Sequence, residues 1–130
     1  NIITQVFDNI SIIITNGCLE IPQIISKIEK NDCHYDIIVC LGCVIRGETT
    51  HYETVCNETN RAIMDLSLNS KAVITNGILN VENYTQAKER SGFWMKDHQD
   101  KGGAAMRSGI ITFSNLNEFF TQSTQSNNNN

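Results

Sequence analysis

Residues 36–51, Asp-Ile-Ile-Val-Cys-Leu-Gly-Cys-Val-Ile-Arg-Gly-Glu-Thr-Thr-His, predict a buried strand that leads through a polar turn into a helix. The apolar run 37–41 has no polar alternation, which is typical of a parallel strand covered on both faces. Ligands of open α/β sheets bind beyond the carboxyl ends of the strands, where a helix N-terminus offers unpaired N–H groups. We therefore expect residues 47–50 to bind an anion and His51 to move protons beside it.

The composition indicates one acidic domain. A chain of 130 residues is long enough for one hydrophobic core and too short for two. The net charge of −4 and isoelectric point near 5.2 argue against a nucleic-acid partner, because phosphate backbones attract basic surfaces. No apolar run approaches the roughly 20 residues that span a bilayer, and no signal-peptide pattern opens the chain. We expect no membrane contact and a cytoplasmic location, with organellar targeting upstream of Asn1 left open.

The cysteines form an odd set of five, at positions 18, 33, 40, 43 and 56. This pattern favours free thiols in a reducing compartment over a disulfide framework. Cys40 and Cys43 have the C-x-x-C spacing, but they end a buried strand and no second pair follows at a zinc spacing. A redox or zinc site is therefore the less favoured alternative to small buried side chains, and we expect no metal.

Strand and helix signals alternate along the chain. Four isoleucines recur at helical spacing, at positions 21, 24, 25 and 28, Asn80 is a candidate N-cap, and Gly92 suits a helix end. The predicted strands are 10–15, 36–41 and 72–75 with its continuation at 78–79, and the predicted helices are 21–30, 50–68, 81–91 and 102–120.

This alternation predicts an α/β fold, a three-layer α/β/α flavodoxin-like domain with a parallel sheet. The domain covers residues 1–120, and the Gln/Ser/Asn-rich residues 121–130 predict a disordered tail. Three strands are few for a sheet buried on both faces. We expect an N-terminally truncated chain, with further strands supplied by missing sequence or by a neighbouring subunit.

Three motifs carry a resemblance to a known family. Residues 42–52 match the pattern G-x-V-I-R-G-x-T-x-H-[FY], residues 17–22 are close to G-[AS]-[FY]-E-[IL]-P, and residues 86–92 match Q-A-x-x-R-[AS]-G. In these motifs, which follow the family order, the chain resembles lumazine synthase over roughly residues 10–112.

The resemblance implies an enzyme of riboflavin biosynthesis. The family condenses 5-amino-6-(D-ribitylamino)uracil with 3,4-dihydroxy-2-butanone 4-phosphate to give 6,7-dimethyl-8-ribityllumazine, phosphate and water, with no cofactor or metal. Its members are homo-oligomers built from pentamers, and neighbouring subunits share each site. By resemblance, His51 is the catalytic acid and base, and Gly47, Glu48 and Thr49 bind the phosphate.

The resemblance assigns the remaining substrate contacts as well. Arg90 reaches the phosphate from an adjacent subunit, Glu20 accepts hydrogen bonds from the ribityl hydroxyls, and Lys101 matches a family lysine. Asn76 stands where many members place an aromatic wall of the pocket. The pyrimidine pocket is lined by Cys18, Leu19, Cys43, Val44 and Ile45.

Two alternatives remain at this point. Family members open with a strand and an aromatic-Asn turn that stacks on the pyrimidine, and this chain begins after that point. Together with Asn76, this motivates a second hypothesis beside catalysis, a truncated or non-catalytic paralogue that acts as an assembly or ligand-binding protein. A flavodoxin-like binding module of another kind is the third possibility, and it rests on fold analogy alone.

Overall fold

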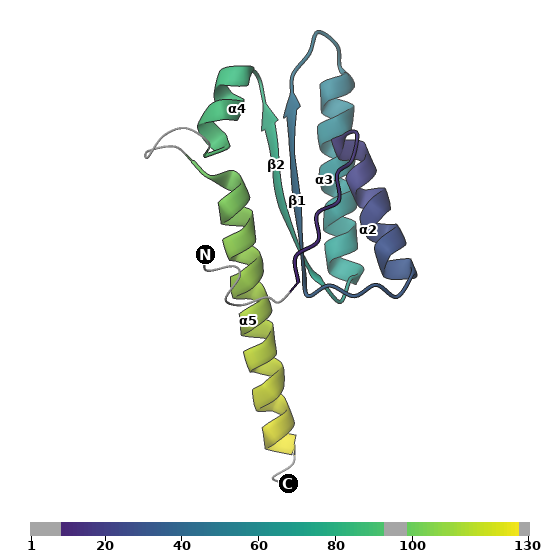
Figure 1. The fold of residues 1–130 in the computed structure, drawn as a ribbon, viewed down its shortest axis with the longest axis vertical. Coiled ribbons are helices and arrows are strands. Elements are labelled where there is room, and N and C mark those ends of the chain that lie inside the picture. Colours follow the sequence, from purple (N-terminus) through teal and green to yellow (C-terminus); the bar gives the residue numbers. More distant parts are fainter. Residues whose placement is uncertain (1–8, 93–98, 128–130) are drawn as a thin grey trace.

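The structure is a computed structural model that describes residues 9–92 and 99–127. Figure 1 shows a short parallel sheet with helices on both sides. In chain order the elements are η1 (Cys18–Glu20), α2 (Ile21–Lys30), β1 (Ile37–Ile45), α3 (His51–Asn69), β2 (Val73–Val81), α4 (Tyr84–Arg90) and α5 (Lys101–Asn127). No helix among the described residues is both long enough and apolar enough to cross a membrane.

β1 and β2 form the sheet of the described residues. They pair in parallel, from Ile37 opposite Val73 to Ile45 opposite Val81, and α3 makes the crossover between them. Both strands run further than predicted, because their pairing continues through residues 42–45 of β1 and 78–81 of β2. The carboxyl ends of both strands therefore lie at one edge, where the first motif places its turn.

The core lies between the sheet and the pair α2 and α3. Ile25 of α2, Cys40 of β1 and Ile63 of α3 are each 3% exposed and form its centre. The partly buried residues packed against it are Ile21, Ile38, Leu66, Ile74 and Ile78. The strand residues of this core are all even-numbered, as expected when alternate side chains point to the same face. The period-3.6 isoleucines of α2 thus predict the observed contact face.

α4 and α5 lie on the other side of the sheet, as Figure 1 shows. Ala105 of α5 is buried close to β2, where a side chain at Gly77 would meet it at 3.0 Å. Helices therefore lie on both faces of β2.

The third helix begins later than predicted. The sequence suggests a start near residue 81 with Asn80 as the cap, whereas β2 continues to Val81 and the cap is Asn83, whose Oδ1 accepts a hydrogen bond from Gln86 N at 3.0 Å. Asn83 has the extended backbone of an N-cap. The helix end is confirmed, since Gly92 follows it with φ of 70°.

The last helix is longer than the prediction. α5 continues to Asn127, so residues 121–127 are helical although their composition predicts disorder. Short polar side chains in this part bond back to carbonyls one turn earlier, for example Thr121 to Asn117 O at 2.8 Å and Thr124 to Phe120 O at 2.9 Å. These local bonds satisfy the polar groups within the helix itself. Residues 128–130, and residues 93–98 of the predicted polar loop, lie outside the described residues.

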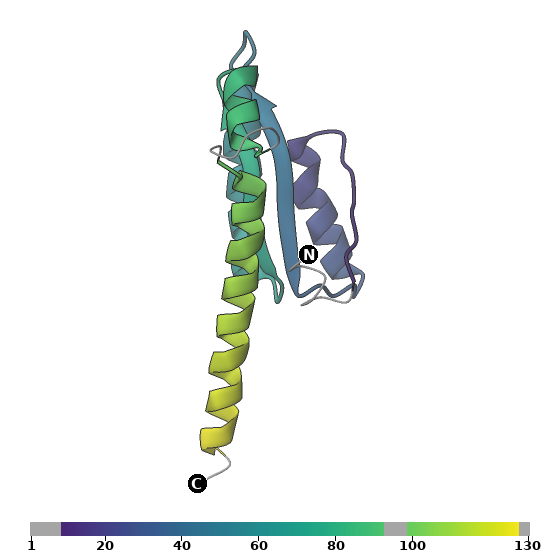
Figure 2. The same ribbon diagram turned by 60° about the vertical axis from the view of Figure 1, so that its left-hand side comes forward.

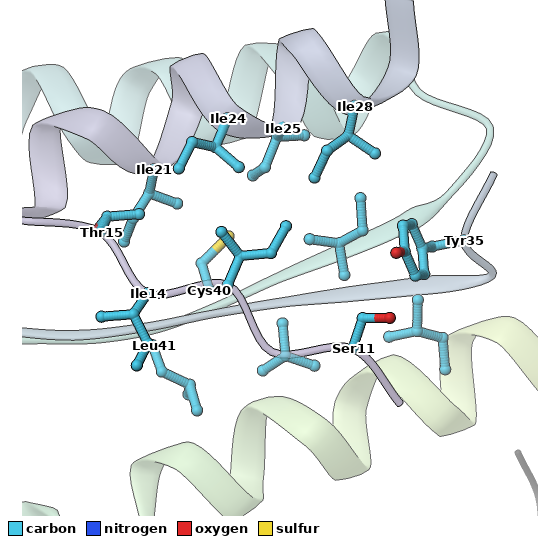
Figure 3. Close-up of a pocket in the computed structure, with 14 residues that line it drawn as sticks. Ser11, Ile14, Thr15, Ile21, Ile24, Ile25, Ile28, Tyr35, Cys40 and Leu41 are labelled. Carbon is cyan, nitrogen blue, oxygen red and sulfur yellow. The ribbon is translucent and has the colours of Figure 1, made fainter. Parts of the chain in front are cut away.

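The predicted strand at residues 10–15 is wrong. This segment has no strand pairing and runs beside α2, outside the sheet (Figures 1 and 2). Ile12 is 85% exposed and Ile14 90% exposed. A cavity of about 350 Å³, lined mostly by isoleucines, separates the segment from β1 and α2, as Figure 3 shows. The apolar pattern is real, but in the described residues nothing pairs with the segment or with the free edge of β1.

Candidate functional site

The turn between β1 and α3 lies at the carboxyl edge of the sheet. β1 ends at Ile45, and α3 begins at His51. Residues 47–51 are all exposed, and the side chain of Thr50, the N-cap, makes no capping hydrogen bond. The His51 N–H donates to Thr49 Oγ1 at 3.4 Å, a long contact. The start of a 19-residue helix thus faces solvent with an imidazole beside it, an arrangement suited to an anion and a proton donor.

The short helix η1 closes over the last part of β1. It lies against both β1 and α3. A side chain at Gly42 would meet Cys18 Sγ at 2.7 Å, so only glycine lets η1 come this close to the strand. Burial raises the pKa of the Cys18 thiol, and a hydrogen bond with the Cys43 backbone partly opposes that shift. The structure therefore brings η1 and the end of β1 together.

Apolar side chains near this edge are partly open to solvent. Leu19 is 40% exposed and Ile45 is 42% exposed, while Val44 is half-buried. Glu20 is exposed, and its carboxylate lies over Gly17, where an added side chain would meet it at 2.9 Å. Apolar surface and a carboxylate thus accompany the His51 turn.

Arg90 and Lys101 lie on the other side of the sheet. Arg90 is the last residue of α4, and Lys101 is the first of α5. A bridge between Ser91 and Asp100 holds the two helix ends together. Arg90 Nη1 donates to Gln86 O at 3.2 Å and lies 3.7 Å from a Glu89 carboxylate oxygen, so its guanidinium folds onto its own helix. Within one chain these two cations do not join His51.

Asn76 lies in the middle of β2, away from the turn. It pairs with Cys40 in the strand register, five positions before the end of β1 at Ile45. Its amide donates to Asn60 Oδ1 of α3 at 2.7 Å, and its Oδ1 accepts from Ile78 N at 2.9 Å. The structure therefore pairs the exposed Asn76 side chain with Asn60 of α3 and does not bring it to His51.

A charged cluster that the sequence pattern does not predict lies at the turn. Arg46 Nε donates to Glu82 Oε2 at 2.6 Å, and Arg46 Nη1 donates to Glu53 Oε1. The guanidinium also lies over the ring of Tyr52, 4.1 Å from its centroid. The register contains the signal: Arg46 and Glu82 each follow the last residue of a paired strand, so opposite charges meet at one edge.

The thiols are free, and their burial differs. Cys40 and Cys56 are buried, whereas Cys43 is exposed. Burial raises the pKa of the Cys40 thiol to about 11. This confirms Cys40 as a small core side chain. Across the described ranges, no group of three or more His, Cys, Asp or Glu residues is arranged to hold a metal ion.

Comparison with known proteins agrees with the motifs. The sequence profile of the 6,7-dimethyl-8-ribityllumazine synthase family matches residues 3–117. The chain is 49% identical over 94 residues to the 6,7-dimethyl-8-ribityllumazine synthase of Bartonella tribocorum, covering 72% of this chain and 60% of that protein. It is 47% identical over 100 residues to the enzyme of the same name from Bartonella henselae, covering 76% of this chain and 63% of that protein.

The match covers most of this chain and a smaller share of its relatives, since it spans under two thirds of their length. The profile match includes η1, both strands, the His51 turn and the first part of α5. The chain belongs to the 6,7-dimethyl-8-ribityllumazine synthase family.

Proposed function

We propose that this protein is a transferase of riboflavin biosynthesis, a 6,7-dimethyl-8-ribityllumazine synthase. It condenses 5-amino-6-(D-ribitylamino)uracil with 3,4-dihydroxy-2-butanone 4-phosphate and releases phosphate and water. The observation that carries the proposal is the meeting of η1, the end of β1 and the His51 turn at one edge of the sheet, in a chain of this family.

The proposed chemistry divides between the turn and the pocket. Backbone N–H groups of Gly47, Glu48 and Thr49, with the Thr49 hydroxyl, hold the phosphate at the start of α3. His51 moves protons during imine formation, phosphate elimination, ring closure and dehydration, because one imidazole nitrogen can accept a proton while the other donates one. The pyrimidine lies against the pocket residues between η1 and the end of β1, and Glu20 accepts hydrogen bonds from the ribityl chain. Holding two substrates side by side supplies much of the acceleration.

A direct assay tests this function. Purified protein is mixed with both substrates, and lumazine absorbance and phosphate release are followed together. We expect both signals to rise at the same rate and above the uncatalysed condensation. A rate equal to the uncatalysed one contradicts the proposal. Binding of either substrate without turnover would support the non-catalytic paralogue instead.

The proposal includes a homo-oligomer, a pentamer or a multiple of one, in which neighbours share sites. Its support is that Arg90 and Lys101 lie across the sheet from His51 in a single chain. Oligomer interfaces also account for exposed apolar side chains on several elements. Examples are Leu41 at 58%, Leu68 at 76%, Ile111 at 60% and Phe119 at 63% exposure.

Mixing two inactive variants tests site sharing. His51→Ala and Arg90→Ala subunits are each expected to form inactive oligomers. After co-refolding in equal amounts, about a quarter of the shared sites by random assembly receive both an intact His51 and an intact Arg90 from different subunits. Activity near that fraction is expected. Activity that stays at the level of the separate variants, or a monomer in light scattering at micromolar concentration, contradicts shared sites.

The proposed fold of the assembled protein is the three-layer flavodoxin-like α/β/α domain, with further strands beside β1. Its support is the free edge of β1, flanked by the cavity of about 350 Å³ on the α2 side. A second hollow along the same edge is bordered by Met106 of α5. A cytoplasmic location belongs to the proposal too, since all five thiols are free.

A further inference from the structure

The turn that carries the proposed phosphate site has little packing of its own. Residues 47–51 are exposed, and a side chain placed on Gly47 would meet no atom within 4 Å from the described residues other than its two chain neighbours. The Thr50 side chain makes no capping bond. An anion site made of backbone N–H groups needs those groups held in fixed directions. The direction of this turn must therefore be set at its two ends.

Arg46 joins both ends of the turn to the second strand. Its backbone N–H donates to Val81 O at 2.9 Å, which continues the strand ladder one residue further. Its guanidinium donates to Glu82, directly after β2, and to Glu53, in the first turn of α3. One side chain thus links the residue before the turn, the helix after it and the neighbouring strand.

The guanidinium is already engaged and is therefore a poor phosphate ligand in this arrangement. Nε and Nη2 face Glu82, at 2.6 and 3.4 Å, and Nη1 faces Glu53. These carboxylates hold the pKa of Arg46 above its usual range, and the hydrogen bond from Arg46 lowers the pKa of Glu53. Two carboxylates against one guanidinium leave a local net charge of one minus, which does not attract an anion. Arg46 therefore fits a role in holding the turn and not in binding the anion.

We propose that Arg46, with Glu53 and Glu82, is a positioning clamp that sets the direction of the 47–51 turn and so its affinity for phosphate. The Glu53 carboxylate supports this role. Its Oε2 is shielded from solvent and has no hydrogen bond in the described structure, so the carboxylate pairs with Arg46 through Oε1. Tyr52 supports the guanidinium from the ring side. The clamp rests on the proposed function for the identity of the anion.

The test replaces Arg46 and measures phosphate directly. Arg46→Met keeps the length of the stem and removes the charge, and Arg46→Lys keeps the charge and removes the fork that reaches two carboxylates. Inorganic phosphate is titrated by ³¹P NMR or calorimetry, and KM is measured for each substrate. We expect Arg46→Met to weaken phosphate binding and raise KM for the phosphorylated substrate roughly tenfold to a hundredfold, with little change in KM for the pyrimidine. Arg46→Lys should recover part of the loss.

Arg61 provides a matched control on the same helix. It also lies between two carboxylates, 2.9 Å from Glu58 and 2.7 Å from Asp65, but all three belong to α3 and none borders the turn. Arg61→Met should keep the phosphate affinity of the unaltered protein. If the ion pairs of Arg46 only stabilised the fold, both Arg46→Met and Arg61→Met should keep the phosphate affinity, because exposed ion pairs stabilise a protein little.

The outcomes separate the two proposals. Unchanged phosphate affinity in a folded Arg46→Met protein, or an equal loss in Arg61→Met, overturns the clamp and leaves the function standing. Phosphate binding that depends on Arg46 in a protein without lumazine synthesis supports the clamp and contradicts the function. No phosphate binding by the unaltered protein overturns the anion turn and the clamp together. If Arg46→Met does not fold, the phosphate affinity of Arg46→Lys is compared with that of Arg61→Met instead.

Discussion

Replacing His51 by Asn is expected to lower kcat for lumazine formation by roughly 10²–10⁴-fold, the range that a well-placed proton-transfer group contributes. Asn keeps a similar size and hydrogen-bonding capacity but cannot exchange a proton near neutral pH. Because His51 opens α3 with an exposed side chain, its replacement should leave the fold intact. The measurement is kcat and both KM values from lumazine absorbance, with circular dichroism to confirm folding.

A second histidine gives the matched control for this change. His34 is exposed in the segment between α2 and β1, beyond the amino end of the strand that leads to His51. His34→Asn is expected to leave kcat unchanged. A His51→Asn protein with full kcat would show that the imidazole takes no part in the chemistry, and phosphate release without lumazine would point to a different reaction.

The sequence predicts most of the elements because local pattern and tertiary context agree there. The isoleucines of α2 have a clear helical period, and the first motif places a strand, a turn and a helix in the observed order. Residues 10–15 show why a pattern alone is insufficient. Their isoleucine run has strand propensity, but a strand also needs a partner edge, and none reaches it in the described chain.

The candidate site also has parts that the sequence predicts and parts that it does not. Sequence neighbours such as His51 and Gly47 come together because one turn joins them, and η1 approaches through Gly42. The cluster around Arg46 depends on the register of two strands, which the sequence does not state. Arg90 ends α4 on the far side of the sheet, so a single chain does not bring it to His51, and its role in the site stays a prediction.

The core beneath α3 stabilises the helix that follows the turn, and replacing Ile63 tests this. Ile63 is 3% exposed and packs with Ile25 and Cys40 between the helices and the sheet. Ile63→Ala leaves a cavity there and is expected to cost about 2–5 kcal/mol of the free energy of unfolding. That is a large part of the roughly 5–15 kcal/mol that stabilises a typical domain, so the midpoint of chemical denaturation should fall to a lower denaturant concentration.

A substitution at the adjacent residue, Met64, distinguishes loss of core packing from a general effect on α3. Met64 is 59% exposed on the same helix, and Met64→Ala should change the free energy of unfolding by less than about 0.5 kcal/mol. Protein concentration must be equal in both measurements, because assembly adds to apparent stability. Well below its unfolding midpoint, Ile63→Ala should keep the kcat of the unaltered protein, since the residue stabilises the helix and does not touch substrate. Equal costs at Ile63 and Met64 would contradict a core between α3 and the sheet.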